Sequence, residues 1–106
     1  TYIYANYAGT ITLDSMAASC HISKSEFSRL FKKAFRQTPF EFLLHYRIKK
    51  SLSLLCGEEY TVTEISSMVG FSGSSYFTEV FRKYMLCTPT EYRRRHRSDA
   101  SQTTSA

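Results

Sequence analysis

The sequence predicts an all-α domain in which two similar helical units are joined by one long helix. Three observations lead to this fold class. Apolar residues recur at spacings of three and four, the period of an amphipathic helix, and no convincing strand pattern is found. Four Ser/Thr-x-x-Glu motifs mark helix starts. Residues of the same type also recur fifty positions apart.

The fifty-residue separation indicates an internal duplication. The identical pairs are Phe27 and Phe77, Phe31 and Phe81, Lys33 and Lys83, Thr38 and Thr88, Pro39 and Pro89, and Glu41 and Glu91. Upstream the separation is forty-nine, so the second copy carries one extra residue at the start of its basic helix. Two copies are too few for a solenoid, and they favour a duplicated supersecondary unit.

The first unit is expected to hold three helices, over residues 2–8, 12–20 and 23–35. Gly9 suits the end of the first helix, and Thr12 suits the cap of the second. In the second helix the residues expected to point inward are Leu13, Met16 and Ala17.

A tight turn is predicted between the second and third helices. It needs a left-handed backbone at His21, and histidine tolerates positive φ better than most residues. The matching position in the second copy is Gly70, which adopts that conformation most readily. A helix, a short turn and a second helix form a helix-turn-helix.

The helix over 23–35 is basic and strongly amphipathic, and its start carries the capping-box spacing of Ser23 and Glu26. Its apolar stripe consists of Phe27, Leu30, Phe31, Ala34 and Phe35. Its opposite face holds Ser25, Ser28, Arg29, Lys32 and Arg36. Such a helix is suited to a DNA major groove, although a solvated basic face is the ordinary alternative.

The long helix is expected to start after Thr38, with Pro39 in its first position, and to reach about Cys56. Its apolar stripe is Leu44, Ile48, Leu52 and Leu55. The second unit then repeats the pattern, with helices predicted over 61–69, 72–85 and 92–97. The expected division is 1–37 for the first unit, 38–57 for the linker helix, 58–97 for the second unit and 98–106 for a disordered tail.

Composition narrows the classes of function. The 106 residues contain 14 Lys and Arg against 9 Asp and Glu, and the net charge of +5 favours a polyanionic partner, either nucleic acid or an anionic membrane surface. The apolar faces are needed for the core, which argues against membrane binding. No nucleophile–base pair, metal spacing or phosphate loop is found, so neither an enzyme nor a cofactor is expected.

The three cysteines are an odd count without C-x-x-C spacing, so a reducing cytosol and three apolar fillers are expected. No membrane span or signal peptide is visible in the sequence. The chain starts at Thr1 rather than Met, so it is expected to be a fragment of a longer protein. A missing N-terminal region would then hold any effector site or dimerisation surface.

Several of these motifs together resemble the DNA-binding domain of the AraC/XylS family of bacterial transcription regulators. They are Leu30-Phe31-Lys32-Lys33 through Thr38-Pro39, Arg47-Ile48 before Leu54-Leu55, Val69-Gly70-Phe71 with Ser75-Tyr76-Phe77, Val80-Phe81-Arg82-Lys83-Tyr84, and Thr88-Pro89-x-x-Tyr92-Arg93. The resemblance covers about residues 3 to 97, and its second half is the more specific.

The resemblance implies about seven helices, with the second helix of each helix-turn-helix in the major groove of double-stranded DNA. A linker of about 18 residues is roughly 27 Å long, and successive major-groove faces are about 34 Å apart. Two adjacent turns would be read as a direct pair of unlike half-elements. The resemblance also implies RNA polymerase as a partner.

The resemblance implies DNA-contacting residues position by position. In the first unit these are Ser25, Ser28, Arg29 and Lys32. In the second unit they are Ser74, Ser75, Thr78 and Arg82. Phosphate anchors are expected at Lys24, Lys33 and Lys83, and at the amides that start the linker and last helices.

Two residues on these faces leave alternatives open. The fork of Arg29 suits the O6 and N7 atoms of guanine, but it also suits a phosphate. Glu79 stands at the position matching Arg29, where it would either accept from a cytosine amino group or repel phosphate. The second unit is therefore expected to recognise DNA sequence weakly or indirectly.

Three further residues are singled out by the family pattern. Arg36 and Leu86 stand where the family usually has glycine, so the ends of both basic helices are expected to be strained or to differ. Arg47 is a family hallmark, and structural hydrogen bonding between the linker and the flanking units is expected of it. The competing function is a helical protein-interaction module without DNA specificity, which weaker salt dependence would distinguish.

Overall fold

The computed structural model describes residues 2–9 and 11–96 of the chain, with the side chains of Tyr2 and Tyr4 outside the described set. Six helices are bounded: α1 (Tyr2–Asn6), α2 (Leu13–Ser19), α3 (Lys24–Phe35), α4 (Pro39–Cys56), α5 (Val62–Met68) and α6 (Ser74–Met85). A further helical stretch covers 89–96, and the described part contains no strand. The all-α prediction is confirmed, whereas the expected tail over 98–106 lies outside the described residues.

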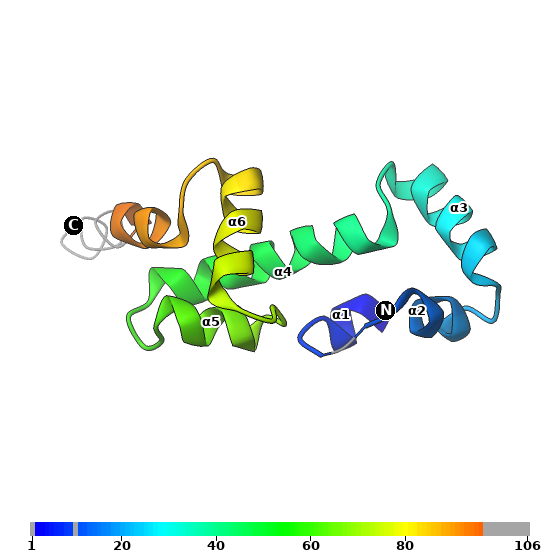
Figure 1. The fold of residues 1–106 in the computed structure, drawn as a ribbon, viewed down its shortest axis with the longest axis horizontal. Coiled ribbons are helices and arrows are strands. Elements are labelled where there is room, and N and C mark those ends of the chain that lie inside the picture. The colour runs from blue at the N-terminus through cyan, green and yellow to red at the C-terminus, as the bar shows by residue number, and fades with distance from the viewer. Residues whose placement is uncertain (1, 10, 97–106) are drawn as a thin grey trace, which may run out of the picture.

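The molecule is elongated, with principal extents of 52 × 24 × 22 Å. Figure 1 shows α4 running along the long axis, with α1, α2 and α3 at its N-terminal end. The helices α5 and α6 and the stretch over 89–96 gather at its other end. In this view α3 and α6 both run from the lower to the upper edge, α3 at one end of the molecule and α6 across the C-terminal half of α4 (Figure 1). The predicted linker helix matches α4 at both ends.

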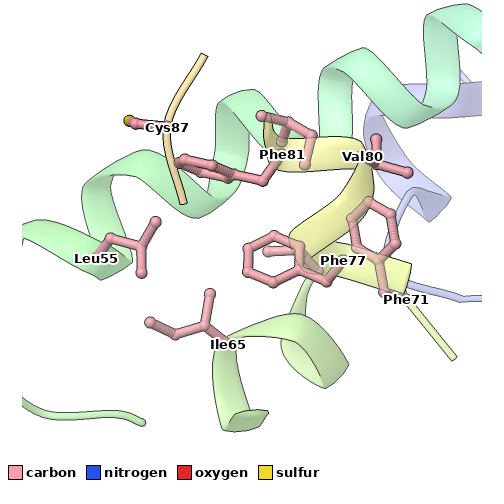
Figure 2. Packing of buried hydrophobic residues seen from close by; sticks show 9 residues of the cluster. Leu55, Ile65, Phe71, Phe77, Val80, Phe81 and Cys87 are labelled. Carbon is pink, nitrogen blue, oxygen red and sulfur yellow. The ribbon is translucent and has the colours of Figure 1, made fainter. Parts of the chain in front are cut away.

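Each unit has its own hydrophobic core, and α4 contributes to both. Leu43 joins the first core, whose other buried members are Ile3, Met16, Ala17 and Phe27. Ile48 and Leu55 of α4 belong to the second core, and Leu44 packs against it. Figure 2 shows Leu55 of α4, Ile65 of α5, and Phe77 and Phe81 of α6 facing one another in this core. Because α4 is buried on two sides, its apolar residues cover more than the single predicted stripe.

Capping boxes of the Thr-x-x-Glu type start three of the helical segments. Thr38 Oγ1 accepts from the Glu41 amide at 3.1 Å, and Glu41 Oε1 accepts from the Thr38 amide at 2.8 Å. The same reciprocal pair joins Thr61 to Glu64 and Thr88 to Glu91. These motifs satisfy amides that would otherwise lack partners at a helix start.

At the start of α3 the expected capping box is only half formed. Ser23 Oγ accepts from the Glu26 amide at 3.2 Å, but the box's return bond is absent from this described segment. An unpredicted box instead starts α2, where Thr12 and Ser15 cap each other. In the box at α2, the hydroxyl of Ser15 takes the role that a glutamate carboxylate has in the other boxes.

The capping carboxylates predict how stability depends on pH. Backbone and side-chain hydrogen bonds from Thr38 hold the pKa of Glu41 below its usual 4.5, and equivalent bonds lower the pKa values of Glu64 and Glu91. A carboxyl group with a lowered folded-state pKa stabilises the fold above its unfolded pKa. That stability is lost as the pH falls through the folded value.

Thermal melting between pH 7 and pH 3 will test this dependence. The wild-type melting temperature should be steady above about pH 5, near the unfolded carboxyl pKa, and should fall below it. A triple variant with Glu41→Gln, Glu64→Gln and Glu91→Gln keeps capping groups without titrating carboxylates, so its profile should be flatter. Parallel profiles for the two proteins would show that the three capping carboxylates do not cause the loss of stability at low pH.

Four of the described residues adopt positive φ. His21 has φ 60° and Gly70 has φ 99°, so the left-handed turns predicted between the paired helices are confirmed. Arg36 (φ 61°) and Leu86 (φ 62°) end α3 and α6 in the conformation that glycine would take more easily. Of the two possibilities left open by the sequence, the left-handed ending with its strain is observed.

Several predicted core positions are exposed instead. Leu30 and Phe35 of α3 are 42% and 52% exposed, whereas Val80 and Phe81 on α6 are buried. The reason is that α3 lies at the end of α4, while α6 crosses its length (Figure 1). The other exposed side chains that were predicted to lie inside are Leu13 and Ala34.

Two further expectations are corrected. Cys20 and Cys56 are exposed, so Cys87 is the one described cysteine that fills a core. The second basic helix starts at Ser74 rather than at Ser72. The extra residue of the second copy lengthens the turn, and Gly73 occupies the cap position with an extended backbone.

Candidate nucleic-acid interface

The outer face of α3 presents the residues predicted to contact DNA. Ser25, Arg29, Lys32 and Lys33 are exposed, and Ser28 is half-buried. The inner face is fixed by aromatic contacts: the rings of Phe27 and Phe31 lie 5.6 Å apart, and those of Phe31 and Phe42 lie 5.3 Å apart. The aromatic anchor leaves the polar face of α3 open to a ligand along its length.

Lys24 already has a partner at the start of α3. Its Nζ lies 3.3 Å from Asp14 Oδ1 of α2, and both side chains are largely exposed. An exposed ion pair of this kind contributes about 0–1 kcal/mol, so a phosphate competes readily for the lysine. The pair also joins the two helices of the first helix-turn-helix.

The outer face of α6 repeats that of α3 with different chemistry. Ser75, Arg82 and Lys83 are exposed, and Ser74 and Thr78 are half-buried. Lys83 Nζ lies 5.8 Å from the centre of the Tyr84 ring, a position that holds the ammonium group at the helix surface. On the inner side, the Phe77 ring lies 5.1 Å from Phe71 and 5.7 Å from Phe81.

Position by position, the two faces are equivalent. Ser28 and Thr78 are both half-buried, and Arg29 and Glu79 are both exposed. The two helices differ in charge. Helix α3 has four basic residues and one acidic residue, for a net charge of +3, and α6 has two basic residues and one acidic residue, for a net charge of +1. A polyanion therefore meets a stronger positive field at α3 than at α6.

The amides that start α4 and the stretch over 89–96 are less available than expected. The Thr38 and Glu41 amides are taken by their own capping box, as are those of Thr88 and Glu91. Each start also carries a capping carboxylate, which disfavours a phosphate at that point. These two starts therefore offer a phosphate fewer free amides than the sequence predicted.

Arg47 lies away from both polar faces and is 8% exposed. Its Nε donates to the Tyr7 carbonyl at 2.7 Å, and its Nη2 donates to the Gly9 carbonyl at 2.9 Å. Burial lowers the pKa of Arg47 from its ordinary value. The expected structural role in joining the linker to a flanking unit is confirmed.

Arg93 has a similar role that the sequence reasoning missed. Its Nε donates to the Leu55 carbonyl at 3.0 Å, and its Nη2 donates to the Tyr60 carbonyl. It thereby ties the stretch over 89–96 to the end of α4 and to the loop that follows. The Tyr-Arg pair in the Thr-Pro-x-x-Tyr-Arg motif was the signal that could have indicated this contact.

Neither a metal site nor a membrane-spanning helix is found among the described residues. Among residues 2–9 and 11–96, no group of three His, Cys, Asp or Glu side chains is placed to hold a metal ion. No described helix combines the length and the apolar character needed to cross a membrane.

Comparison with known proteins identifies the family. A family described as "Helix-turn-helix domain" matches residues 16–95. The chain is 41% identical over 93 residues to the uncharacterized HTH-type transcriptional regulator YdeC of Bacillus subtilis, covering 88% of this chain and 32% of that protein. It thus spans about a third of the length of this curated relative.

Solved structures share the whole arrangement. An AraC-type transcriptional regulator from Chromobacterium violaceum superposes with a TM-score of 0.83 at 25% identity, covering 90% of this chain and 85% of the other. The DNA-binding domain of AdpA, solved in complex with a target DNA, superposes with a TM-score of 0.89 at 23% identity. That match covers 95% of this chain and 91% of the other, and it shows a shared fold.

The duplicated helix-turn-helix, the family match over 80 of 106 residues and the identity to YdeC agree. The chain therefore belongs to the AraC-type helix-turn-helix DNA-binding domains of bacterial transcriptional regulators, a family that binds DNA sequence-specifically to regulate transcription.

Proposed function

We propose that the chain binds one face of a DNA duplex by placing α3 and α6 in two successive major-groove segments. The observation that carries this proposal is the presence of equivalent exposed faces on two helices at opposite ends of α4. The 18 residues of α4 span about 27 Å, and the major groove returns to the same face after about 34 Å. The 52 Å long axis of the molecule accommodates both contacts.

In this arrangement α3 is the main reader of sequence. Arg29 is exposed on its outer face, where the guanidinium fork suits the O6 and N7 atoms of a guanine. Ser25, Ser28 and Lys32 share that face and reach neighbouring bases or phosphates. Lys24 and Lys33 bind the phosphates on either side, which fixes the register of α3 in the groove.

The second helix contributes less affinity and reads its segment weakly or through DNA shape. Its small side chains, Ser74, Ser75 and Thr78, allow close approach, while Arg82 and Lys83 bind phosphate. Glu79 opposes the phosphate field at the position where α3 has Arg29. The site is therefore a direct pair of unlike half-elements, with most sequence information in the half that α3 contacts.

Selection of bound duplexes from a random library, with this chain as bait, tests the proposal. The enriched site should extend over about two helical turns and consist of two unequal blocks, one groove repeat apart. A single block no longer than the contact of one helix would show that only one unit enters DNA. Recovery of no preferred sequence would instead favour the helical protein-interaction module.

Salt dependence separates phosphate binding from other modes of association. The logarithm of the affinity should fall linearly with the logarithm of salt concentration, by about 0.9 for each phosphate neutralised. Lys33→Ala should reduce that slope by about 1 without changing the selected sequence. Lys50, which lies over the Tyr46 ring on α4, supplies the matched control, since Lys50→Ala removes the same charge outside the proposed contact.

We further propose RNA polymerase and an effector as partners of the full-length regulator, with dimerisation also outside the described helices. The support is the role of the family in transcription and the third of the relatives' length that this chain spans. Activation or repression then depends on where the paired site lies relative to a promoter.

A further inference from the structure

The two units touch each other directly, in addition to being joined by α4. The loop after α1, at Tyr7 and Gly9, lies against the turn after α5, at Gly70. A Cβ atom on Gly70 would lie 2.7 Å from the Tyr7 carbonyl oxygen and 2.8 Å from Arg47 Nε. With φ at 99° as well, this position excludes every side chain for two independent reasons.

Arg47 lies at the centre of this contact. It extends from α4, and both carbonyls that accept its hydrogen bonds, those of Tyr7 and Gly9, belong to the first unit. The same guanidinium also lies against Gly70 of the second unit, whose Cβ position is 3.1 Å from Arg47 Cζ. One buried side chain therefore contacts the linker, the first unit and the second unit.

The residues around Arg47 show the same sharing. Tyr7 packs against both hydrophobic cores, and its ring meets that of Tyr46 on α4 edge-on at 5.2 Å. The first unit reaches α4 through the core at Leu43, through the rings of Phe31 and Phe35 that pack on Phe42, and through this contact. Without the contact, the first unit would be held to α4 only near the N-terminal end of that helix, at Phe42 and Leu43, and its angle to the second unit would be less fixed.

We propose that Arg47 is a positioning residue that fixes the angle between the two units and so sets the spacing of half-elements that a DNA site must have. The inference rests on the proposed two-groove binding. It assigns no base contact to Arg47: the residue acts through the orientation of α3 relative to α6. A rigid junction makes binding sensitive to spacing, because each added base pair rotates the second half-element by about 34° on a duplex of about 10.5 base pairs per turn.

The chain offers a matched control in Arg93. Its guanidinium also donates to two backbone carbonyls, but those of Leu55 and Tyr60 lie at the far end of α4 and in the loop after it. Arg93→Met removes a comparable clamp while leaving the junction untouched. Gly70→Ala disturbs the junction from the second unit and keeps Arg47 itself.

The test measures affinity for the selected duplex and for duplexes with one or two base pairs inserted or deleted between the half-elements. For the wild type, one inserted pair should weaken binding by about tenfold, as expected when a half-element is rotated out of reach. The spacing ratio is the affinity for the selected duplex divided by the affinity for the duplex with one inserted pair. For Arg47→Met and Gly70→Ala this spacing ratio should fall to about threefold or less, because a unit that pivots can follow the rotated groove. Arg93→Met should lower the affinity for duplexes of every spacing by the same factor, so its spacing ratio should stay that of the wild type.

A second readout needs no DNA and so separates this inference from the proposed function. Cys20 in the first unit and Cys56 at the end of α4 are exposed, whereas Cys87 is buried, so spin labels attach to the first two. The distance distribution between the labels should be narrow for the wild type and for Arg93→Met. It should broaden for Arg47→Met and Gly70→Ala.

The outcomes are distinct. A folded Arg47→Met that keeps both the narrow distribution and the wild-type spacing ratio would overturn the inference. If Arg47→Met fails to fold, the decision passes to Gly70→Ala, judged by the same two measurements. A library selection that yields no two-block site would remove the proposed function, while the label distances would still report whether Arg47 holds the units together.

Discussion

Replacing Phe77 with Ala should lower the free energy of unfolding by about 3–5 kcal/mol, the usual cost of removing a fully buried phenylalanine. Phe77 has no exposed surface, and its ring packs between those of Phe71 and Phe81. The duplicated position in the first unit is Phe27, which is 9% exposed and belongs to a smaller core. Phe27→Ala should therefore cost less.

Urea unfolding monitored by circular dichroism compares the two variants at matched positions. Because α4 belongs to both cores, either substitution should lower the single midpoint of a two-state transition. Equal costs for the two variants would show that the first core is as tightly packed as the second. A biphasic transition in the wild type would show that the cores unfold independently.

Arg29→Ala should weaken binding to the preferred duplex by about 1–3 kcal/mol and relax the preference at one base position. The reason is that the substitution removes a bidentate donor and leaves the matching guanine edge without a partner. Competition binding against duplexes varied at each position of the selected site measures both effects. An equal loss of affinity for every duplex would identify Arg29 as a phosphate contact instead.

Glu79 supplies the opposite case at the equivalent position of α6. If this carboxylate repels phosphate, Glu79→Ala should strengthen binding to all duplexes alike. If it accepts from a cytosine amino group, the same substitution should relax one position in the second block and weaken binding to the selected site. The contrast between Arg29 and Glu79 thus measures how unequally the two units read DNA.

Local features of this fold could be predicted from the sequence because their causes are local. Thr38, Pro39 and Glu41 together specify where a helix starts, and α4 begins as those residues predict. The left-handed turn at His21 follows from its alignment with Gly70. The exposed polar faces of α3 and α6 follow from helical periodicity, although their contacts with DNA stay predictions.

Features that depend on distant contacts could not be predicted in the same way. Periodicity places Leu30 and Phe35 on an apolar stripe, but burial requires a neighbouring element, and α3 extends beyond the end of α4. Cys20 is exposed for a related reason, because it caps the end of α2 at the turn. The hydrogen bonds of Arg93 join segments more than thirty residues apart, which no short window of sequence reveals.

The sharing of α4 between two cores limits how such a protein can diversify. Inserting one residue into this helix would turn everything beyond it by about 100° and advance it by about 1.5 Å. Leu43 and Ile48 serve different cores, so that rotation would break the fold of at least one of them. The length of α4 therefore cannot change by single residues without loss of the fold. New target preferences must arise from substitutions on the outer faces of α3 and α6.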